Sequence, residues 1–159
     1  MLLIYNVGVN SCCIIRSMGS SAPARILLVE DNPGDVRLLQ EALRFASVEH
    51  EFVVAEDGEE ALRLVENGMP AGGALPRLAI LDVNVPRVDG PRVLAHMRSR
   101  EGWRDVPAIV MSSAESPEVL RQVAAIGNAV FYVKPSRLDE FLALGEKIKA
   151  VLAHGIETR

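Results

Sequence analysis

The sequence predicts an α/β protein built on an open, doubly wound parallel sheet of five strands, with helices on both faces. From Arg25 onward, short apolar runs alternate five times with longer amphipathic segments, which is the pattern of strands joined by crossover helices. Runs such as ILLV and LAIL are apolar at consecutive positions. Strands buried on both faces of a parallel sheet have this composition, whereas a half-exposed antiparallel sheet would alternate apolar and polar residues.

Each expected strand ends in a polar residue, and each is bounded by turn-forming residues. The five strands are expected at RILLVE (25–30), HEFVVAE (50–56), RLAILD (77–82), VPAIVMS (106–112) and AVFYVK (129–134).

The expected helices have recognisable ends. Pro33 suits the first turn of the first helix, and Gly68, Gly102 and Gly127 suit the positions where later helices stop. The helices are expected at 33–45, 58–68, 91–102, 116–127 and 136–155, and residues 69–76 (MPAGGALP) are expected to form a loop.

A chain of 159 residues with 49% hydrophobic residues is sufficient for one globular domain. We assign that domain to residues 23–154 and a C-terminal tail to 155–159. The net charge of −4 gives no broad basic surface for a phosphate backbone, which argues against direct DNA binding.

The first 22 residues are expected to lie outside the fold, as a disordered extension or the result of a start site placed too early. Their apolar stretch lacks a preceding positive charge and falls short of the roughly 20 residues of a membrane-spanning helix, so it makes a poor signal peptide or anchor. Cys12 and Cys13 are adjacent, which suits neither a disulfide between distant segments nor a metal site. A cytoplasmic location is the expectation.

Polar residues follow four of the expected strands. Glu30 and Asp31 end the first, Asp82 the third, Ser112 the fourth and Lys134 the fifth. In doubly wound sheets, ligands bind at the carboxyl ends of the strands. Each residue alone has an ordinary explanation, such as a helix cap or a surface lysine, but these explanations leave their joint placement unexplained.

Carboxylates that converge on one crevice repel each other unless a cation is present. Oxygen ligands favour Mg²⁺ over zinc, which prefers histidine or cysteine. Lys134 and Ser112 facing the same crevice suit an anion with several oxygens, such as a phosphoryl group. With its charge offset in this way, one carboxylate could attack phosphorus and form an acyl phosphate.

The segments ILLVEDNPGD, ILDVNVPRVDG, IVMSSAES and FYVKP resemble, in their order and separation, the receiver domains of response regulators in bacterial two-component systems. The resemblance covers about residues 25–154 and is closest to stand-alone receivers, including those paired with phytochrome-type histidine kinases. It implies a CheY-like, flavodoxin-like sheet with strand order 2-1-3-4-5.

The resemblance also implies roles for the strand-end residues. Asp82 would be the phosphoacceptor, and Mg²⁺ would be held by Glu30, Asp31, Asp82 and the backbone carbonyl of Asn84. The phosphoryl group would come from a histidine kinase or a phosphotransfer protein, in a phosphorelay that signals to a downstream protein target. The protein would not be an enzyme in the usual sense, although it would assist its own phosphorylation and dephosphorylation.

Ser112 and Lys134 would bind the phosphoryl group, and Ser112 and Phe131 would form the conformational switch. Tyrosine is commoner than phenylalanine at the position of Phe131, so the resemblance implies a switch based on packing. It further implies a cis peptide bond between Lys134 and Pro135, and possible homodimers through the fourth helix, fifth strand and fifth helix.

Two alternatives remain open at this point. One is a receiver-like interaction module that works without phosphorylation. The other is an enzyme on a similar sheet, either a phosphatase with an aspartyl intermediate or a flavin carrier. Against the phosphatase, Asn84 stands where such enzymes have a second acid, and against the flavin carrier, the loop EDNPGD lacks a phosphate-binding composition.

Overall fold

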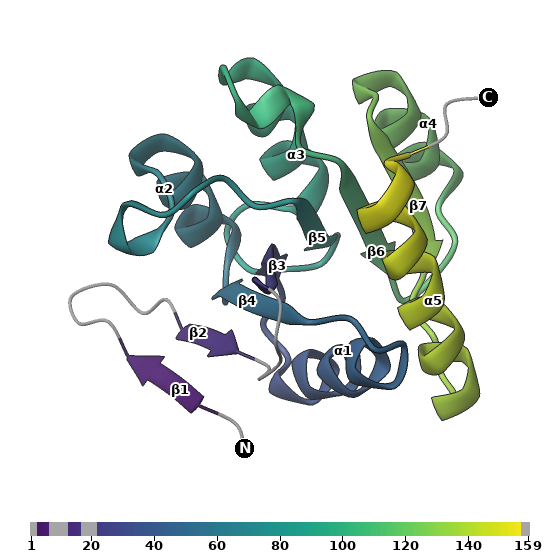
Figure 1. Cartoon of the computed structure of the whole chain (residues 1–159). Helices are drawn as coiled ribbons and strands as arrows, with labels where there is room; N and C mark the ends of the chain where they lie inside the picture. The colour runs from purple at the N-terminus through teal and green to yellow at the C-terminus, as the bar shows by residue number, and fades with distance from the viewer. Residues whose placement is uncertain (1–2, 7–12, 17–21, 157–159) are drawn as a thin grey trace.

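The strands form where the sequence has its consecutive apolar residues. A computed structural model describes residues 3–6, 13–16 and 22–156. The five expected strands are β3 (Ala24–Val29), β4 (His50–Ala55), β5 (Leu78–Asp82), β6 (Ala108–Ser112) and β7 (Ala129–Val133). They are parallel and lie in the order β4-β3-β5-β6-β7, which confirms the predicted order 2-1-3-4-5 (Figure 1).

Two further strands differ from the expectation that residues 1–22 lie outside the fold. β1 (Leu3–Asn6) and β2 (Cys13–Arg16) pair antiparallel with each other, and β2 pairs antiparallel with β4, so the sheet has seven strands. Both segments contain the apolar and β-branched residues that favour strands, and β2 extends the sheet by pairing along the outer edge of β4. The rest of the range, apart from Ala22, lies outside the described residues, as do residues 157–159 of the expected C-terminal tail.

The helices begin at side chains that accept hydrogen bonds from their first free backbone amides. Asn32, Asp57, Asp89 and Ser116 act in this way for the first four helices. The helices are α1 (Pro33–Phe45), α2 (Gly58–Asn67), α3 (Gly90–Ser99), α4 (Pro117–Ile126) and α5 (Leu138–His154), and two short 3-10 helices are η1 (Pro70–Gly72) and η2 (Trp103–Asp105).

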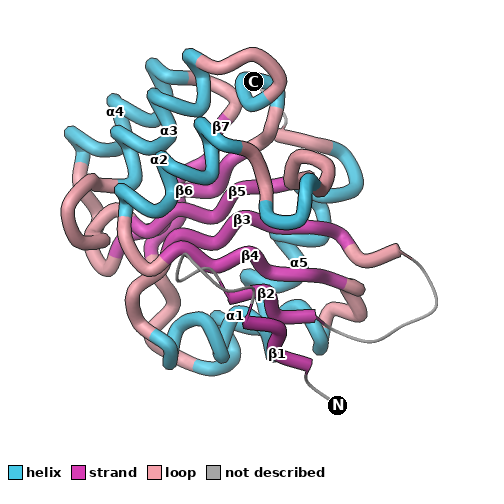
Figure 2. Tube along the Cα trace, turned by 90° about the vertical axis from the view of Figure 1, so that its left-hand side faces the viewer, coloured by secondary structure: helices cyan, strands magenta, loops and turns pink. Residues whose placement is uncertain are grey.

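The core has two layers, one on each face of the sheet. Because neighbouring residues of a strand point to opposite faces, Leu27 and Val29 face one layer while Ile26 and Leu28 face the other. Figure 2 shows α2, α3 and α4 on one side of the parallel strands and α1 and α5 on the other. β7 differs from its neighbours, since its residues are half-buried or exposed whereas those of β5 and β6 are fully buried.

Two glycines allow close packing around this core. A side chain at Gly145 in α5 would overlap the backbone carbonyl of Ala42 in α1, so the absence of one lets these helices approach closely. At the start of α3, a Cβ at Gly90 would lie 2.5 Å from the carbonyl oxygen of Asp82. The amino end of α3 is thereby held directly against the end of β5.

Candidate functional site

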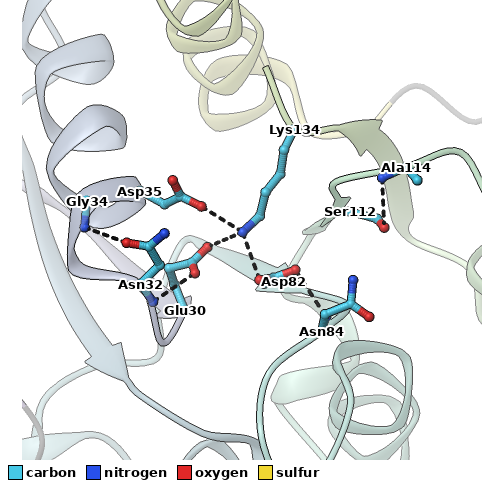
Figure 3. Close-up of polar contacts among 9 residues, drawn as sticks. All are labelled: Glu30, Asn32, Gly34, Asp35, Asp82, Asn84, Ser112, Ala114 and Lys134. Atoms are coloured by element: carbon cyan, nitrogen blue, oxygen red, sulfur yellow. Dashed lines mark hydrogen bonds and ion pairs between the residues drawn. The ribbon is translucent and has the colours of Figure 1, made fainter. Parts of the chain in front are cut away.

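Four of the predicted residues come together at the carboxyl edge of the sheet. Glu30 follows β3, Asp82 ends β5, Ser112 ends β6 and Lys134 follows β7. Glu30, Asp82 and Ser112 are at most 5% exposed, although they are polar. Figure 3 shows the side chains of Glu30, Asp82 and Lys134 converging on one point at this edge.

The ammonium group of Lys134 is the centre of the arrangement. Its Nζ atom lies 2.7 Å from Oε2 of Glu30, 2.8 Å from Oδ2 of Asp82 and 2.9 Å from Oδ2 of Asp35 (Figure 3). A lysine ammonium has three N–H donors, and these three carboxylates accept one each. The side chain of Lys134 is only 11% exposed, so the ion pairs are largely shielded from water.

The ionisation of this cluster follows from burial and pairing. Burial by itself lowers the pKa of Lys134, but its hydrogen bonds to Asp82, Glu30 and Asp35 outweigh that effect and raise the pKa above its ordinary value. Burial also raises the pKa of Glu30, against the opposing effect of its hydrogen bond to Lys134. Lys134 is therefore a permanent cation at neutral pH.

Three of the acids have the geometry of a cation site. Oxygen atoms of Glu30, Asp31 and Asp82 lie within 4.8 Å of one another, and Asp31 is exposed at the rim. The donors are all carboxylate oxygens, which suit a hard divalent cation such as Mg²⁺ or Mn²⁺. The predicted ligand set is thus brought together, with the exception of the Asn84 carbonyl, for which the structure gives no contact to the cluster.

One backbone group and one side chain fix the carboxylate of Asp82. The backbone N–H of Asn84 donates to Oδ1 over 3.1 Å, while Lys134 binds Oδ2, so both oxygens are held (Figure 3). The lysine is aligned by its own backbone, whose N–H donates to the carbonyl of Ser112 over 2.7 Å.

Ser112 lies beside the charged cluster, and Phe131 lies in β7, three residues before Lys134. The hydroxyl of Ser112 accepts a hydrogen bond from the backbone N–H of Ala114 at 3.4 Å, which leaves its proton free to be donated to an incoming group. Phe131 is half-buried and packs against the core layer that contains α2, α3 and α4.

The structure departs from one expectation at this edge. The described residues contain no cis peptide bond, so the bond between Lys134 and Pro135 is trans. Trans is the favoured form of an X–Pro bond by about 0.5–1 kcal/mol, and this bond adopts it.

Sequence reasoning did not assign Asp35 to the site. Asp35 lies in the first turn of α1, and its carboxylate reaches Lys134 from the side opposite Asp82 (Figure 3). Its position five residues after Glu30 could have revealed it, since the turn at Asn32 brings the start of α1 back over the end of β3. The backbone N–H of Asn32 donates to Oε1 of Glu30 over 3.1 Å, which closes that turn.

The class of protein follows from two features. These are the doubly wound sheet with this strand order, and the acidic cluster with a lysine at its carboxyl edge. Residues 26–145 match the model of the response regulator receiver domain, and the chain belongs to this family. Its members are signalling proteins of two-component systems, which interact with histidine kinases or other phosphodonors.

Particular relatives resemble the chain along most of the fold. The response regulator Rcp1 of Synechocystis sp. is 34% identical over 100 residues, which cover 62% of this chain and 68% of Rcp1. The crystal structure of the phosphorylated cyanobacterial phytochrome response regulator RcpA is similar with a TM-score of 0.74 and 31% identity, over 84% of this chain and 96% of RcpA. The structure of Mn²⁺-bound Rcp1 has a TM-score of 0.73 and 25% identity, over 86% of this chain and 99% of that one.

The helices of the described residues are too short or too polar to cross a membrane.

Proposed function

We propose that this chain accepts a phosphoryl group on Asp82 from a histidine kinase or phosphotransfer protein and passes the signal to a protein partner. One observation carries the proposal. A lysine that is largely shielded from water binds directly to the carboxylate of Asp82, beside a cluster of acids that suits a divalent cation. A buried carboxylate that is paired with a lysine and lies next to a cation site is arranged to bear a group of higher negative charge.

Glu30, Asp31 and Asp82 would hold Mg²⁺, with the backbone carbonyl of Asn84 as a further ligand. The bound cation would offset the negative charge of the transferred phosphoryl oxygens. Rcp1 has been crystallised in an Mn²⁺-bound form, which is consistent with a cation site of this kind here.

The transfer itself requires little from the chain beyond positioning. An oxygen of Asp82 forms a bond to phosphorus while the nitrogen–phosphorus bond of the donor phosphohistidine breaks and the imidazole leaves. The backbone N–H of Asn84 donates to Oδ1 of Asp82, which limits rotation of the carboxylate during the attack. Lys134 and the Ser112 hydroxyl would then donate to the phosphoryl oxygens.

The phosphoryl group would be read at the surface formed by α4, β7 and α5. Ser112 moves to donate to a phosphoryl oxygen, the loop at Ser113 and Ala114 follows, and Phe131 turns further into the space that opens. The surface formed by α4, β7 and α5 then has two packing arrangements that differ by a few kcal/mol, and phosphorylation selects one of them. The partner that recognises this surface is a protein, and a second copy of this chain is one candidate.

The likeness to RcpA, a cyanobacterial phytochrome response regulator, makes phytochrome-type histidine kinases the first donors to test. We propose that the chain acts in the cytoplasm, where histidine kinases are supplied with ATP, and that it works through contacts with proteins rather than with DNA or membranes.

Labelling by acetyl phosphate tests the proposed phosphoacceptor. The wild-type chain should be labelled in the presence of Mg²⁺ and lose labelling when EDTA is added. Asp82→Asn, which keeps the shape of the side chain, should abolish the label, because the amide is not a nucleophile of comparable strength. Asp89→Asn, a matched change at the N-cap of α3, is the control and should retain the label.

Undiminished labelling of Asp82→Asn would show that another residue is the acceptor. A wild-type chain that no phosphodonor labels, but that still binds a partner, would favour the interaction module that works without phosphorylation. A panel of phosphorylated histidine kinases, assayed for transfer to the chain, identifies the donor.

A further inference from the structure

We propose that Asp35 is a positioning residue, which receives the Lys134 ammonium when a divalent cation occupies the carboxylates of Glu30 and Asp82. The inference rests on the proposed function, because it concerns how that site takes up its cation. It adds Asp35 to the site as a fourth acid and assigns this acid a role other than metal ligation.

Lys134 and a divalent cation compete for the same oxygens. The Nζ atom lies 2.7 Å from Glu30 and 2.8 Å from Asp82, and both of these acids belong to the cluster that could hold a metal ion. Two cations at the same pair of carboxylates repel each other strongly at short range. Uptake of the metal ion therefore requires the ammonium to give up at least one of these contacts.

Asp35 offers the ammonium an acceptor that the metal ion does not use. Its Oδ2 atom lies 2.9 Å from Nζ, whereas the cluster of acids close enough to share one ion consists of Glu30, Asp31 and Asp82. Asp35 approaches from the first turn of α1, whose start is fixed by the side chain of Asn32 accepting from Gly34 over 2.8 Å. The backbone that carries Asp35 is thus fixed, and its carboxylate lies outside the group of acids that could share one ion.

The cost of an unpaired buried charge explains why such an acceptor matters. With only 11% of its side chain exposed, Lys134 cannot replace lost carboxylates fully with water. A buried ammonium without partners is strongly unfavourable. Without Asp35, the lysine would keep its contacts with Glu30 and Asp82 and resist the incoming cation.

The test is a double-mutant cycle read by Mg²⁺ binding to the full chain, measured by calorimetry at one pH and ionic strength. Asp35→Ala should weaken Mg²⁺ binding by about fivefold, as expected from losing one partly buried ion pair. Lys134→Met should tighten binding, because the competing cation is gone. In the Lys134→Met background, the further change Asp35→Ala should have a smaller effect than in the wild type.

The size of the effect in the two backgrounds separates this role from simple charge attraction. If Asp35 acted only through its negative charge, its removal would weaken binding equally or more in Lys134→Met, where no ammonium offsets it. That result would overturn the inference. Asp35→Asn keeps an acceptor oxygen for the lysine and should fall between the wild type and Asp35→Ala.

Glu118→Ala is the matched control, since Glu118 is an exposed acid in the first turn of α4. It removes one negative charge and one helix-terminal acid and should leave Mg²⁺ affinity unchanged. Thermal melts establish that each variant is folded, and should Asp35→Ala unfold, the same cycle is run with Asp35→Asn.

The outcomes distinguish this inference from the function on which it rests. If the wild type binds Mg²⁺ and Asp35→Ala binds it equally well, the inference is wrong and the proposed function stands. If the wild type does not bind Mg²⁺ at all, the proposed cation site is wrong, and the inference falls with it.

Discussion

The residues that follow the strands, such as Lys134, are the part of the site that could be predicted from the sequence. The place of Lys134 after β7, like the places of Glu30, Asp82 and Ser112, follows from the polar residue that ends each apolar run. The contact with Asp35 could not be predicted in the same way, because it depends on the turn that brings α1 back towards β3. Strand periodicity specifies which residues reach an edge, whereas loop conformation decides which others join them.

His50 is a buried base away from the site, and it gives the chain a specific pH dependence. The centroids of its ring and the ring of Phe52 are 4.8 Å apart, and its Nδ1 atom lies 2.9 Å from the carbonyl oxygen of Val48. Burial lowers its pKa from 6.5, with the Val48 carbonyl opposing the shift and the charges of Arg44 and Glu49 acting in opposite directions. The neutral form is therefore favoured in the folded state.

We predict that the free energy of unfolding decreases as the pH falls below about 6.5, because the unfolded chain then binds a proton that the folded chain resists. The contribution is fully present above this pH and is lost at up to about 1.4 kcal/mol per pH unit. His50→Asn, whose amide can donate to the same carbonyl, should remove this part of the dependence. Urea unfolding at pH 7.5 and 5.5 measures it, and an identical decrease in the variant would contradict the prediction.

Phe131 is predicted to act through packing. Phe131→Tyr should change the free energy of unfolding by less than about 1 kcal/mol, whereas Phe131→Ala should lower it by about 2 kcal/mol, because the half-buried ring leaves a void. Beryllofluoride, a phosphoryl mimic, should alter hydrogen exchange over residues 113–140 in the wild type and in Phe131→Tyr, but less in Phe131→Ala. Unchanged exchange in the wild type would rule out this switch.

At the scale of elements, the sequence predicted the five parallel strands and five main helices within about two residues at most ends. The capping residues account for the agreement at the helix ends. Helix α1 begins at Pro33 and ends at Phe45 as expected, because Asn32 caps it and its apolar stripe is continuous. The short η1 and η2 segments were not predicted, since single turns have too few residues to show a period.

The contact between α1 and α5 depends on Gly145, because the absence of a side chain there makes room for the carbonyl of Ala42. Alanine is the better helix former by about 1 kcal/mol, so an exposed glycine replaced by alanine would stabilise the helix. We predict the opposite here, with Gly145→Ala lowering the free energy of unfolding by about 1–2 kcal/mol because the helices must separate.

Ala150→Gly provides the control, since Ala150 is exposed on the same helix and reports the intrinsic difference between the two residues. Chemical denaturation of both variants makes the comparison. A Gly145→Ala chain more stable than the wild type would mean that α1 and α5 adjust without cost.

At the scale of the whole molecule, the β1–β2 hairpin was the main feature that sequence reasoning did not anticipate. An antiparallel pair at a sheet edge has no crossover helix, so the alternation that revealed the other strands is absent there. The parallel sheet and its two layers of helices contain all four strand-end residues of the site without it.

We therefore predict that a chain starting at Ser20 unfolds cooperatively and melts within a few degrees of the full chain. The edge of β4 would lose its partner in this shortened chain, so self-association should increase with concentration. Calorimetry and analytical ultracentrifugation measure the two effects. Loss of cooperative melting would show that the hairpin is needed for folding of the rest.

The buried position of Trp103 allows its fluorescence to report unfolding of the chain. It is the single tryptophan of the chain, is 3% exposed, and lies in η2 ahead of β6, at the edge of the sheet opposite Asp82 and Lys134. Its fluorescence therefore follows exposure of the core to water and is insulated from direct quenching by an ion at the acidic cluster. Because a ligand that binds only the folded state stabilises it according to its concentration and affinity, unfolding followed by this one emission band also gives the affinity of the site for a colourless ion.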